Sequence, residues 1–206
     1  NPTLYELYGT DNYGIKGNTS IKPEKSKTNE LSLNYGYSEN ITFKSTAYKT
    51  IIYDRIESNA AYSKHENMVT DINQRGLENS VFFKNNDQTF SLFNSFSKSR
   101  KDNGQAQNRR PDLSYGVDYF KKFNLSDYGP FDLNLSHRFI GDHIDWTGSA
   151  NTFVKSVDLV DLTIRKNWFG NILSLNINNL LNERYEKPAT YSQDGRQIRF
   201  GFNRKY

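Results

Sequence analysis

The segment that decides the fold is residues 197–206, QIRFGFNRKY. Its apolar and aromatic side chains are spaced so that they share one face of an extended strand: Ile198, Phe200, Phe202 and Tyr206. Polar residues and a glycine fall on the other face, because successive side chains of a strand point to opposite sides. A strand of this kind that ends on an aromatic residue suits a barrel wall between lipid and water. The sequence therefore predicts an all-β, antiparallel transmembrane β-barrel.

The composition agrees with a barrel wall. Hydrophobic residues make up 35% of the 206 residues, and the mean hydropathy is -0.83, which is poor for a water-soluble core. Disordered chains also have low hydrophobicity, but they contain few aromatic residues, whereas this chain has 14 Tyr and 14 Phe. Only alternate residues of a barrel strand need to be apolar, so the low hydropathy and the many aromatic residues are both expected of a barrel.

Cysteine content, charge and hydropathy each argue against one class of protein or site. The absence of cysteine excludes disulfide frameworks and thiolate metal sites. The net charge is +4 with a pI near 9.0, but the basic residues are dispersed among acidic ones. We therefore expect them to face lipid phosphates or an anionic ligand rather than nucleic acid. No run reaches the roughly 18–20 apolar residues of a spanning helix, and no N-terminal signal sequence is present.

Alternation of apolar and polar residues predicts nine strands, with connections that are alternately short and long. Bacterial barrels have short periplasmic turns and long extracellular loops, which places the C-terminus in the periplasm and the first 28 or so residues outside the cell. A glycine inside a strand often marks a bulge, so a bulge is expected at Gly76. The predicted strands are about 30–37, 41–53, 68–83, 89–97, 112–120, 131–139, 157–166, 172–178 and 196–206.

The odd number of strands predicts that residues 1–206 form a single but incomplete domain. Single-chain bacterial barrels have an even number of strands. An open sheet would leave unpaired backbone groups in hydrocarbon, each costing several kcal/mol. We therefore expect this chain, a fragment or a truncated gene product, to need further strands or an oligomeric partner.

Three segments together resemble the C-terminal part of TonB-dependent outer-membrane receptors. The first is NPTLYELYG followed by GNTSIKPEKSKTNELSLNY, the second is NQRGLENSVFF, and the third is LSLNINNLLNERYEKPATYSQDGRQIRFGF. They match in order and span nearly the whole chain. The matching residues are Pro2, Glu6, Leu7, Gly17, Asn18, Pro23, Glu24, Glu30, Gly76, Glu78, Asn179, Leu180, Leu181, Asn182, Tyr185, Gly195 and Arg196.

The resemblance implies the C-terminal nine or so strands of a barrel of about 22 strands, without the plug domain. It also implies a bacterial outer-membrane location and TonB-energised uptake of a scarce nutrient chelate, of the siderophore-iron or vitamin B12 class. Expected partners are outer-membrane lipid, the TonB complex through the plug, and the metal chelate as ligand. A fourth expected partner is the barrel-assembly machinery, for which Ile198, Phe200, Phe202 and Tyr206 would form the recognition signal. No cofactor is implied. One departure is Arg204, where the family usually has an apolar or aromatic residue.

The candidate ligand-binding residues lie in the long loops. Histidine and carboxylates bind divalent ions, and arginines attract anionic chelates through charge-assisted contacts. The alternatives are solvated loops, contacts of the arginines with lipid phosphates, and a tryptophan in the interfacial aromatic belt. The candidates are Arg109, Arg110, Asp142, His143, Asp145, Trp146 and Tyr191.

The sequence predicts that the protein is not an enzyme. It has three histidines, and His137 falls on the same face as Leu133 and Leu135, which does not suit a base in water. No nucleophile-elbow motif occurs. The other hypotheses are a non-transporting surface binding or adhesion barrel and, less favoured, an outer-membrane hydrolase. A plug domain with a short coupling segment upstream in the gene would support transport.

Overall fold

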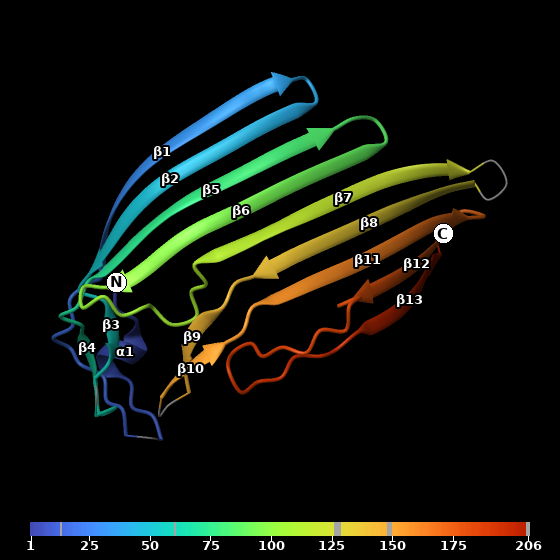
Figure 1. Ribbon diagram of the computed structural model, residues 1–206. Helices are drawn as coiled ribbons and strands as arrows, with labels where there is room; N and C mark the ends of the chain where they lie inside the picture. Colours follow the sequence, from blue (N-terminus) through green and yellow to red (C-terminus); the bar gives the residue numbers. More distant parts are fainter. Residues whose placement is uncertain (13, 60, 126–128, 148–149, 205–206) are drawn as a thin grey trace. The chain divides into compact units, whose positions relative to one another are not determined.

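The computed structural model describes residues 1–12, 14–59, 61–125, 129–147 and 150–204. Nine strands form one antiparallel sheet in the order β1-β2-β5-β6-β7-β8-β11-β12-β13, with successive strands of the chain lying side by side (Figure 1). Their bounds are β1 Lys25–Ser38, β2 Ile41–Tyr53, β5 Ile72–Lys84, β6 Gln88–Lys101, β7 Leu113–Leu125, β8 Gly129–Ile140, β11 Val157–Trp168, β12 Asn171–Asn178 and β13 Gln197–Arg204. In the described part of the chain, no helix has the length and apolarity needed to cross a membrane.

The nine predicted strands are all confirmed, in the predicted order. The observed strand bounds differ from the predicted ones mainly where apolar and polar residues do not alternate. β1 begins at Lys25, five residues before the predicted start, because residues 25–30 are polar on both faces and give no alternation signal. The sequence missed the short helix α1 (Leu4–Tyr8) and two small hairpins, β3 (Ile56–Ser58) with β4 (His65–Asn67) and β9 (His143–Trp146) with β10 (Asn151–Val154).

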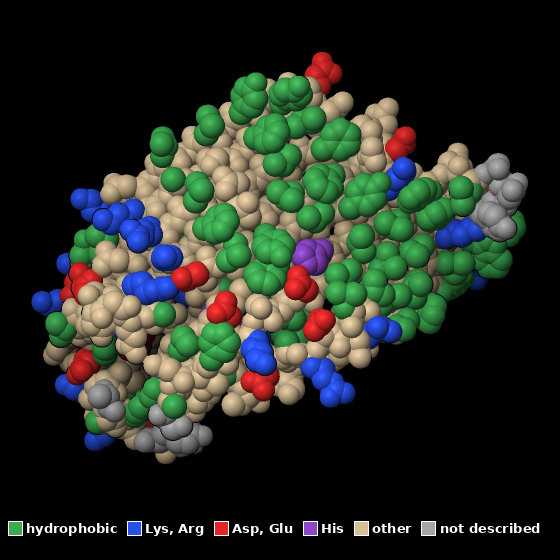
Figure 2. Space-filling model, in the orientation of Figure 1, with side chains coloured by type: hydrophobic (Ala, Val, Ile, Leu, Met, Phe, Trp, Pro, Cys, Tyr) green, Lys and Arg blue, Asp and Glu red, His purple; other side chains and the backbone are tan. Residues whose placement is uncertain are grey.

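The chain divides into two compact units. The larger, unit 2, comprises residues 32–47, 77–97 and 108–206. Its strands carry an apolar face, which we name the outward face. Strand register places one row of side chains across five strands: Tyr119, Leu135, Leu162, Ile177 and Ile198. Figure 2 shows hydrophobic side chains gathered over β7, β8 and β11. The alternation of the last strand is thereby confirmed, although Tyr206 lies outside the described residues.

A chain of polar side chains interrupts the apolar outward face of unit 2. The Ser45 hydroxyl donates to the Asn79 side-chain oxygen at 2.7 Å, and the Asn79 amide donates to the Asn94 side-chain oxygen at 2.9 Å. Along each of the three strands, apolar residues precede and follow the polar side chain on the same face, among them Phe43 and Leu92. A polar group in hydrocarbon is costly unless it finds a partner, and these three side chains partner one another.

The opposite, inward face contains glycines against which aromatic rings pack. Gly116 in β7 is one: a Cβ there would lie 2.5 Å from the Phe93 ring and 2.6 Å from the His137 carbonyl oxygen. Real Cβ atoms do not approach other atoms so closely, and one of the two obstacles is the backbone of the neighbouring strand. The absence of a side chain at Gly116 therefore allows the Phe93 ring to pack directly against the backbone of β7.

We expect Gly116→Ala to destabilise the folded protein by about 1–3 kcal/mol, the usual cost of overpacking a filled site. Gly36→Ala is the matched control, because a Cβ at Gly36 meets no atom within 4 Å. The measurement is urea unfolding of the full-length protein in detergent. Equal midpoints for the two variants would show that the Phe93 contact does not constrain this position.

Unit 1 comprises residues 1–31, 48–76 and 98–107. Its helix α1 begins with a capping box, in which the Thr3 hydroxyl accepts from the Glu6 N–H while the Glu6 carboxylate accepts from the Thr3 N–H. The Glu6 carbonyl also accepts from the Asn18 N–H at 2.8 Å. The Asn18 side-chain amide in turn donates to the His65 carbonyl. Glu6 and Asn18, two of the residues that carry the family resemblance, therefore hold the helix against the segment that follows it.

The bulge expected at Gly76 is wrong. Backbone hydrogen bonds join Asp102 to Asp71 on one side of Gly76 and Asn85 to Gln88 on the other, in the same register. A bulge would shift the register by one residue. The glycine is needed for a different reason, since a Cβ at Gly76 would lie 2.6 Å from the Tyr48 ring.

Candidate functional site

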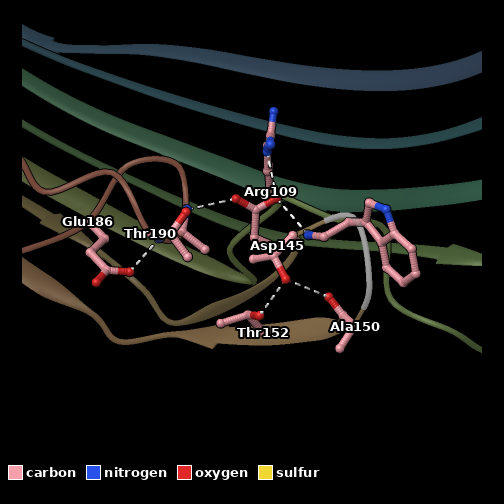
Figure 3. A network of polar contacts seen from close by, with 9 residues as sticks. Arg109, Asp145, Ala150, Thr152, Glu186 and Thr190 are labelled. Carbon is pink, nitrogen blue, oxygen red and sulfur yellow. Dashed lines mark hydrogen bonds and ion pairs between the residues drawn. The ribbon is translucent and has the colours of Figure 1, made fainter. Parts of the chain in front are cut away.

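Asp145 joins two long connections and the β9–β10 hairpin of unit 2. One carboxylate oxygen accepts from the Arg109 Nε at 2.6 Å and from the Trp146 N–H at 2.7 Å. The other accepts from the Ala189 N–H at 2.9 Å. Arg109 comes from the connection before β7, and its own N–H donates to the Ile144 carbonyl. Figure 3 shows these groups converging on the carboxylate from three segments. We name this arrangement the Asp145 clamp.

Asp145 is only 1% exposed, whereas the Arg109 side chain is 60% exposed. Burial alone would raise the pKa of Asp145. The hydrogen bonds from Ala189, Arg109 and Trp146 outweigh burial, so the pKa of this carboxyl lies below its ordinary value of 3.8. The clamp therefore holds a fully ionised carboxylate at neutral pH.

The lowered pKa predicts how the clamp responds to acid. A carboxyl whose folded pKa lies below its unfolded value stabilises the fold fully above the unfolded pKa. This stabilisation disappears as pH falls from about 4 through the lower folded pKa. We expect the loops around Asp145 to remain closed at pH 5 and to open progressively below pH 4. Proteolysis by pepsin across this range measures the opening. Asp145→Asn, which does not titrate, should remove the step, and a step that persists in this variant would assign it to another group.

The hairpin that carries Asp145 was not expected, since residues 140–153 were predicted to be a loop without strands. In the structure His143 pairs with Val154 and Trp146 with Asn151. Beyond the pairs, the Thr147 hydroxyl contacts the Ala150 carbonyl and the Thr152 hydroxyl, both at 3.3 Å. Strands of four residues are too short to show alternation above chance, which is why the sequence did not reveal them.

A cavity of about 720 Å³ lies beside the clamp in unit 2. Apolar side chains line part of it, including Ile140 and the buried Val154 and Val157. Three cations and one carboxylate stand around it, namely Arg109, Lys155, Lys187 and Glu186. The remaining lining residues are Pro111, His143, Tyr185, Pro188 and Gln193.

The structure brings some of the predicted site residues together and leaves others apart. Arg109 and His143 both line the cavity, and Asp145 holds Arg109 beside it. Asp145 itself is buried and hydrogen-bonded, so it acts through the clamp rather than as an open ligand group. The other four predicted residues, Arg110, Asp142, Trp146 and Tyr191, are exposed and are not among the residues that line the cavity. In the described part of the chain, no group of three or more His, Asp or Glu side chains is placed to hold a metal ion.

The loop after β12 carries the second wall of the cavity, and Asn179 fixes its base. Asn179 is 6% exposed and has a left-handed φ of 52°. Its amide donates to the Glu183 and Asp194 carbonyls at 2.9 and 3.3 Å, and its side-chain oxygen accepts from the Glu183 N–H at 2.9 Å. Its own N–H donates to the Asp161 carboxylate at 2.8 Å. One side chain therefore closes the base of the loop.

Asn182 makes a second closure in the same loop. Its side-chain oxygen accepts from the Arg196 N–H at 2.9 Å, and a Cβ at Gly195 would lie 2.7 Å from that oxygen. The Arg196 Nε also donates to the Leu180 carbonyl at 2.9 Å. The Asn-Leu and Gly-Arg elements that carried the resemblance are thus two ends of one hydrogen-bonded loop base.

The sequence did not single out four of the cavity residues: Lys155, Glu186, Lys187 and Pro188. Lys155 follows β10, and the other three lie in the loop closed by Asn179. Their common signal is their place in long connections after strands that face the same end of the sheet. That signal does not distinguish them from neighbouring residues, because loop contacts depend on how the loops fold back on one another.

Comparison with known proteins decides the family. A family model described as "TonB dependent receptor-like, beta-barrel" matches residues 1–180. The chain belongs to the TonB-dependent receptor β-barrel family. Its members are receptors of the bacterial outer membrane, which places this barrel segment there.

Sequence relatives include the vitamin B12 transporter BtuB of Vibrio cholerae, which is 24% identical over 198 residues. The match covers 92% of this chain and 30% of the relative. The barrel segment thus spans less than a third of the length of the curated relatives that it matches.

Solved structures share the fold at lower identity. The FrpB iron transporter from Neisseria meningitidis has a TM-score of 0.72 at 16% identity, covering 94% of this chain and 33% of that one. The ferripyoverdine receptor of the Pseudomonas aeruginosa outer membrane has a TM-score of 0.74 at 15% identity, covering 90% of this chain and 28% of that one. Both are receptors or transporters, as the family name implies.

Proposed function

We propose that this barrel segment forms wall and extracellular loops of a receptor that takes up a metal chelate across the outer membrane with energy from TonB. The chelate is of the siderophore-iron or vitamin B12 class. The observation that carries the proposal is the cavity beside the Asp145 clamp, which combines an apolar lining with a surplus of cations.

The cavity has the chemistry of an anionic, partly apolar ligand. Arg109, Lys155 and Lys187 supply three positive charges against two carboxylates, Glu186 in the lining and the ionised Asp145 that pairs with Arg109. Cations form the stronger, charge-assisted hydrogen bonds with carboxylate or phosphate oxygens. Val154, Pro188 and Tyr185 offer apolar contact to the body of the ligand, and ligand pockets commonly have such mostly apolar linings with a few polar groups.

The names of the relatives point to the same range of ligands. BtuB is a vitamin B12 transporter, FrpB is an iron transporter, and the pyoverdine receptor binds ferripyoverdine. We propose that the rest of the receptor supplies a plug, through which the TonB complex acts, and that the long connections of this segment face the exterior.

The test is ligand binding by the full-length receptor that contains this chain. A panel of ferric siderophores and cyanocobalamin is titrated against the wild type and against Lys155→Ala with Lys187→Ala. We expect one class to bind and the double variant to weaken that binding about tenfold or more, as for the loss of two charge-assisted contacts. The matched control is Lys122→Ala with Arg165→Ala, two exposed cations that flank Asp132 in the sheet.

Growth of a strain that lacks the receptor gene, measured on the same panel of chelates, tests uptake in cells. Loss of growth on one chelate class supports the proposal and names the substrate. If the deletion affects growth on none of them and the purified receptor binds none, the proposed nutrient classes are wrong.

A further inference from the structure

The Arg109 guanidinium keeps one edge free beside the cavity of unit 2. Its Nε donates to the Asp145 carboxylate at 2.6 Å. Within the described residues, no hydrogen bond or ion pair engages its two terminal nitrogens, Nη1 and Nη2. The Arg109 side chain is 60% exposed, and it lines the cavity. The edge that Asp145 leaves free is therefore open to a ligand.

The geometry of that edge selects its partner. A guanidinium is planar and holds its N–H groups in a fixed fork. At the end of the fork, Nη1 and Nη2 each point one N–H in the same direction, which matches the two oxygens of a carboxylate. An ammonium group has no such fork. Because Asp145 occupies only Nε, Arg109 can bind a second carboxylate through its end edge.

Contacts at both ends of the side chain hold this edge in place. The Arg109 N–H donates to the Ile144 carbonyl at 2.7 Å, and Asp145 fixes Nε. Asp145 is itself 1% exposed and is held by the Trp146 and Ala189 N–H groups. An arginine that is already ordered loses less conformational freedom when it binds a ligand.

The two carboxylates near the cavity already have donors of their own. Asp145 accepts three hydrogen bonds. Glu186 accepts from the Thr190 N–H at 2.7 Å, and Figure 3 shows its carboxylate joined to Thr190 and not to Arg109. Among the described residues, neither Lys155 nor Lys187 forms an ion pair with a carboxylate. The cations of the cavity therefore remain available to an anionic ligand.

The three cations belong to three different connections of unit 2. Arg109 precedes β7, Lys155 follows β10, and Lys187 lies in the loop after β12. A ligand with one anionic group would leave part of this charge unpaired, whereas a chelate with several carboxylates can pair with all three. The side-chain amides of vitamin B12 offer no carboxylate.

We propose that the end edge of Arg109 binds a free carboxylate of the ligand, and that the ligand is a polycarboxylate chelate of ferric iron. This assignment rests on the proposed function and narrows it to one class of chelate. Lys155 and Lys187 pair with further carboxylates of the same ligand, and the apolar lining contacts its carbon skeleton.

The first experiment measures binding of defined chelates to the full-length receptor that contains this chain. The carboxylate probes are ferric citrate and ferric rhizoferrin. The comparison probes are ferric enterobactin, which is a catecholate, ferrichrome, which is a neutral hydroxamate, and cyanocobalamin. We expect a carboxylate probe to bind and the comparison probes to bind at least about tenfold more weakly, as for the loss of a charge-assisted pair.

The second experiment replaces the fork and keeps the charge. Arg109→Lys should weaken binding of the carboxylate probe about tenfold or more, because an ammonium group cannot make the paired hydrogen bonds. The matched control is Arg110→Lys, since Arg110 is exposed and is not among the residues that line the cavity. Amide exchange at Ala189 should be unchanged in Arg109→Lys, which separates loss of the fork from opening of the clamp. Equal affinity of Arg109→Lys and the wild type would overturn the proposal.

A competition experiment on the wild type does not depend on any variant. Excess tricarballylate, a plain tricarboxylate, should displace the bound carboxylate probe, and its triamide should not. Displacement by both or by neither would overturn the proposal. If the receptor binds only a comparison probe, the proposed function stands and the carboxylate assignment is wrong. If it binds none of the probes, the proposed function itself fails.

Discussion

Replacing Asp145 by alanine will open the loops beside the cavity while leaving the sheet folded. The change removes three hydrogen bonds to a buried carboxylate, from Arg109, Trp146 and Ala189. Hydrogen bonds to charged groups contribute about 1.5–3 kcal/mol each, but the exposed Arg109 contributes at the low end of surface ion pairs. We expect the free energy of opening to fall by about 3 kcal/mol, or roughly a hundredfold in the opening equilibrium.

Amide hydrogen exchange measures this directly, because Trp146 and Ala189 donate their N–H groups to the carboxylate. Both amides should exchange about a hundredfold faster in Asp145→Ala, and the affinity for the chelate identified in the binding panel should fall with them. The matched control is Asp142→Ala, which removes an exposed carboxylate three residues away. Unchanged exchange at Ala189 in Asp145→Ala would show that other contacts hold the two segments together.

Replacing Asn179 by alanine will release the base of the second loop. The variant loses the three side-chain hydrogen bonds to Glu183 and Asp194 and leaves the carbonyls of both residues without the Asn179 donor. It also places alanine at a φ of 52°, a conformation that asparagine tolerates better. With about 1 kcal/mol for each lost bond and about 1 kcal/mol for the backbone, we expect a loss of roughly 3–4 kcal/mol.

Asn179→Gly separates the two causes. Glycine accepts the left-handed conformation freely but cannot make the hydrogen bonds, so it should recover only about 1 kcal/mol relative to alanine. The measurement is the urea midpoint of unfolding together with trypsin cleavage after Arg184. If glycine restored wild-type stability, the hydrogen bonds would be dispensable. If both variants matched the wild type, Asn179 would not hold the loop base.

Alternation predicted the sheet well because membrane strands obey it over long stretches. The predicted strand 41–53 has the observed bounds of β2. The strand prediction failed where the sequence shows no alternation of apolar and polar residues. The polar start of β1 and the four-residue strands β9 and β10 show no usable period. Helix α1 is different, since the Thr3-to-Glu6 spacing of a capping box is present in the sequence and was available as a signal.

The candidate site was only partly within reach of the sequence. The type of residue at Asp145 suggested ligand chemistry, yet its partners Arg109 and Ala189 lie 36 and 44 residues away along the chain. Burial of a carboxylate depends on such distant partners, which no local pattern reveals. The resemblance located Asn179 and Gly195 as significant positions, and only the structure shows that their significance is the closure of a loop.

The polar chain of Ser45, Asn79 and Asn94 has a consequence for how the barrel is assembled. A slip of one residue between strands would turn apolar side chains to the wrong face and is strongly disfavoured. A slip of two residues keeps every side chain on its proper face, and apolar rows alone oppose it weakly. Such a slip would separate the three polar groups within hydrocarbon, where each would lack its partner. The hydrogen bonds among Ser45, Asn79 and Asn94 therefore favour the native register as β2, β5 and β6 pair. They disfavour a slip of two residues, which the alternation of apolar and polar residues alone would allow.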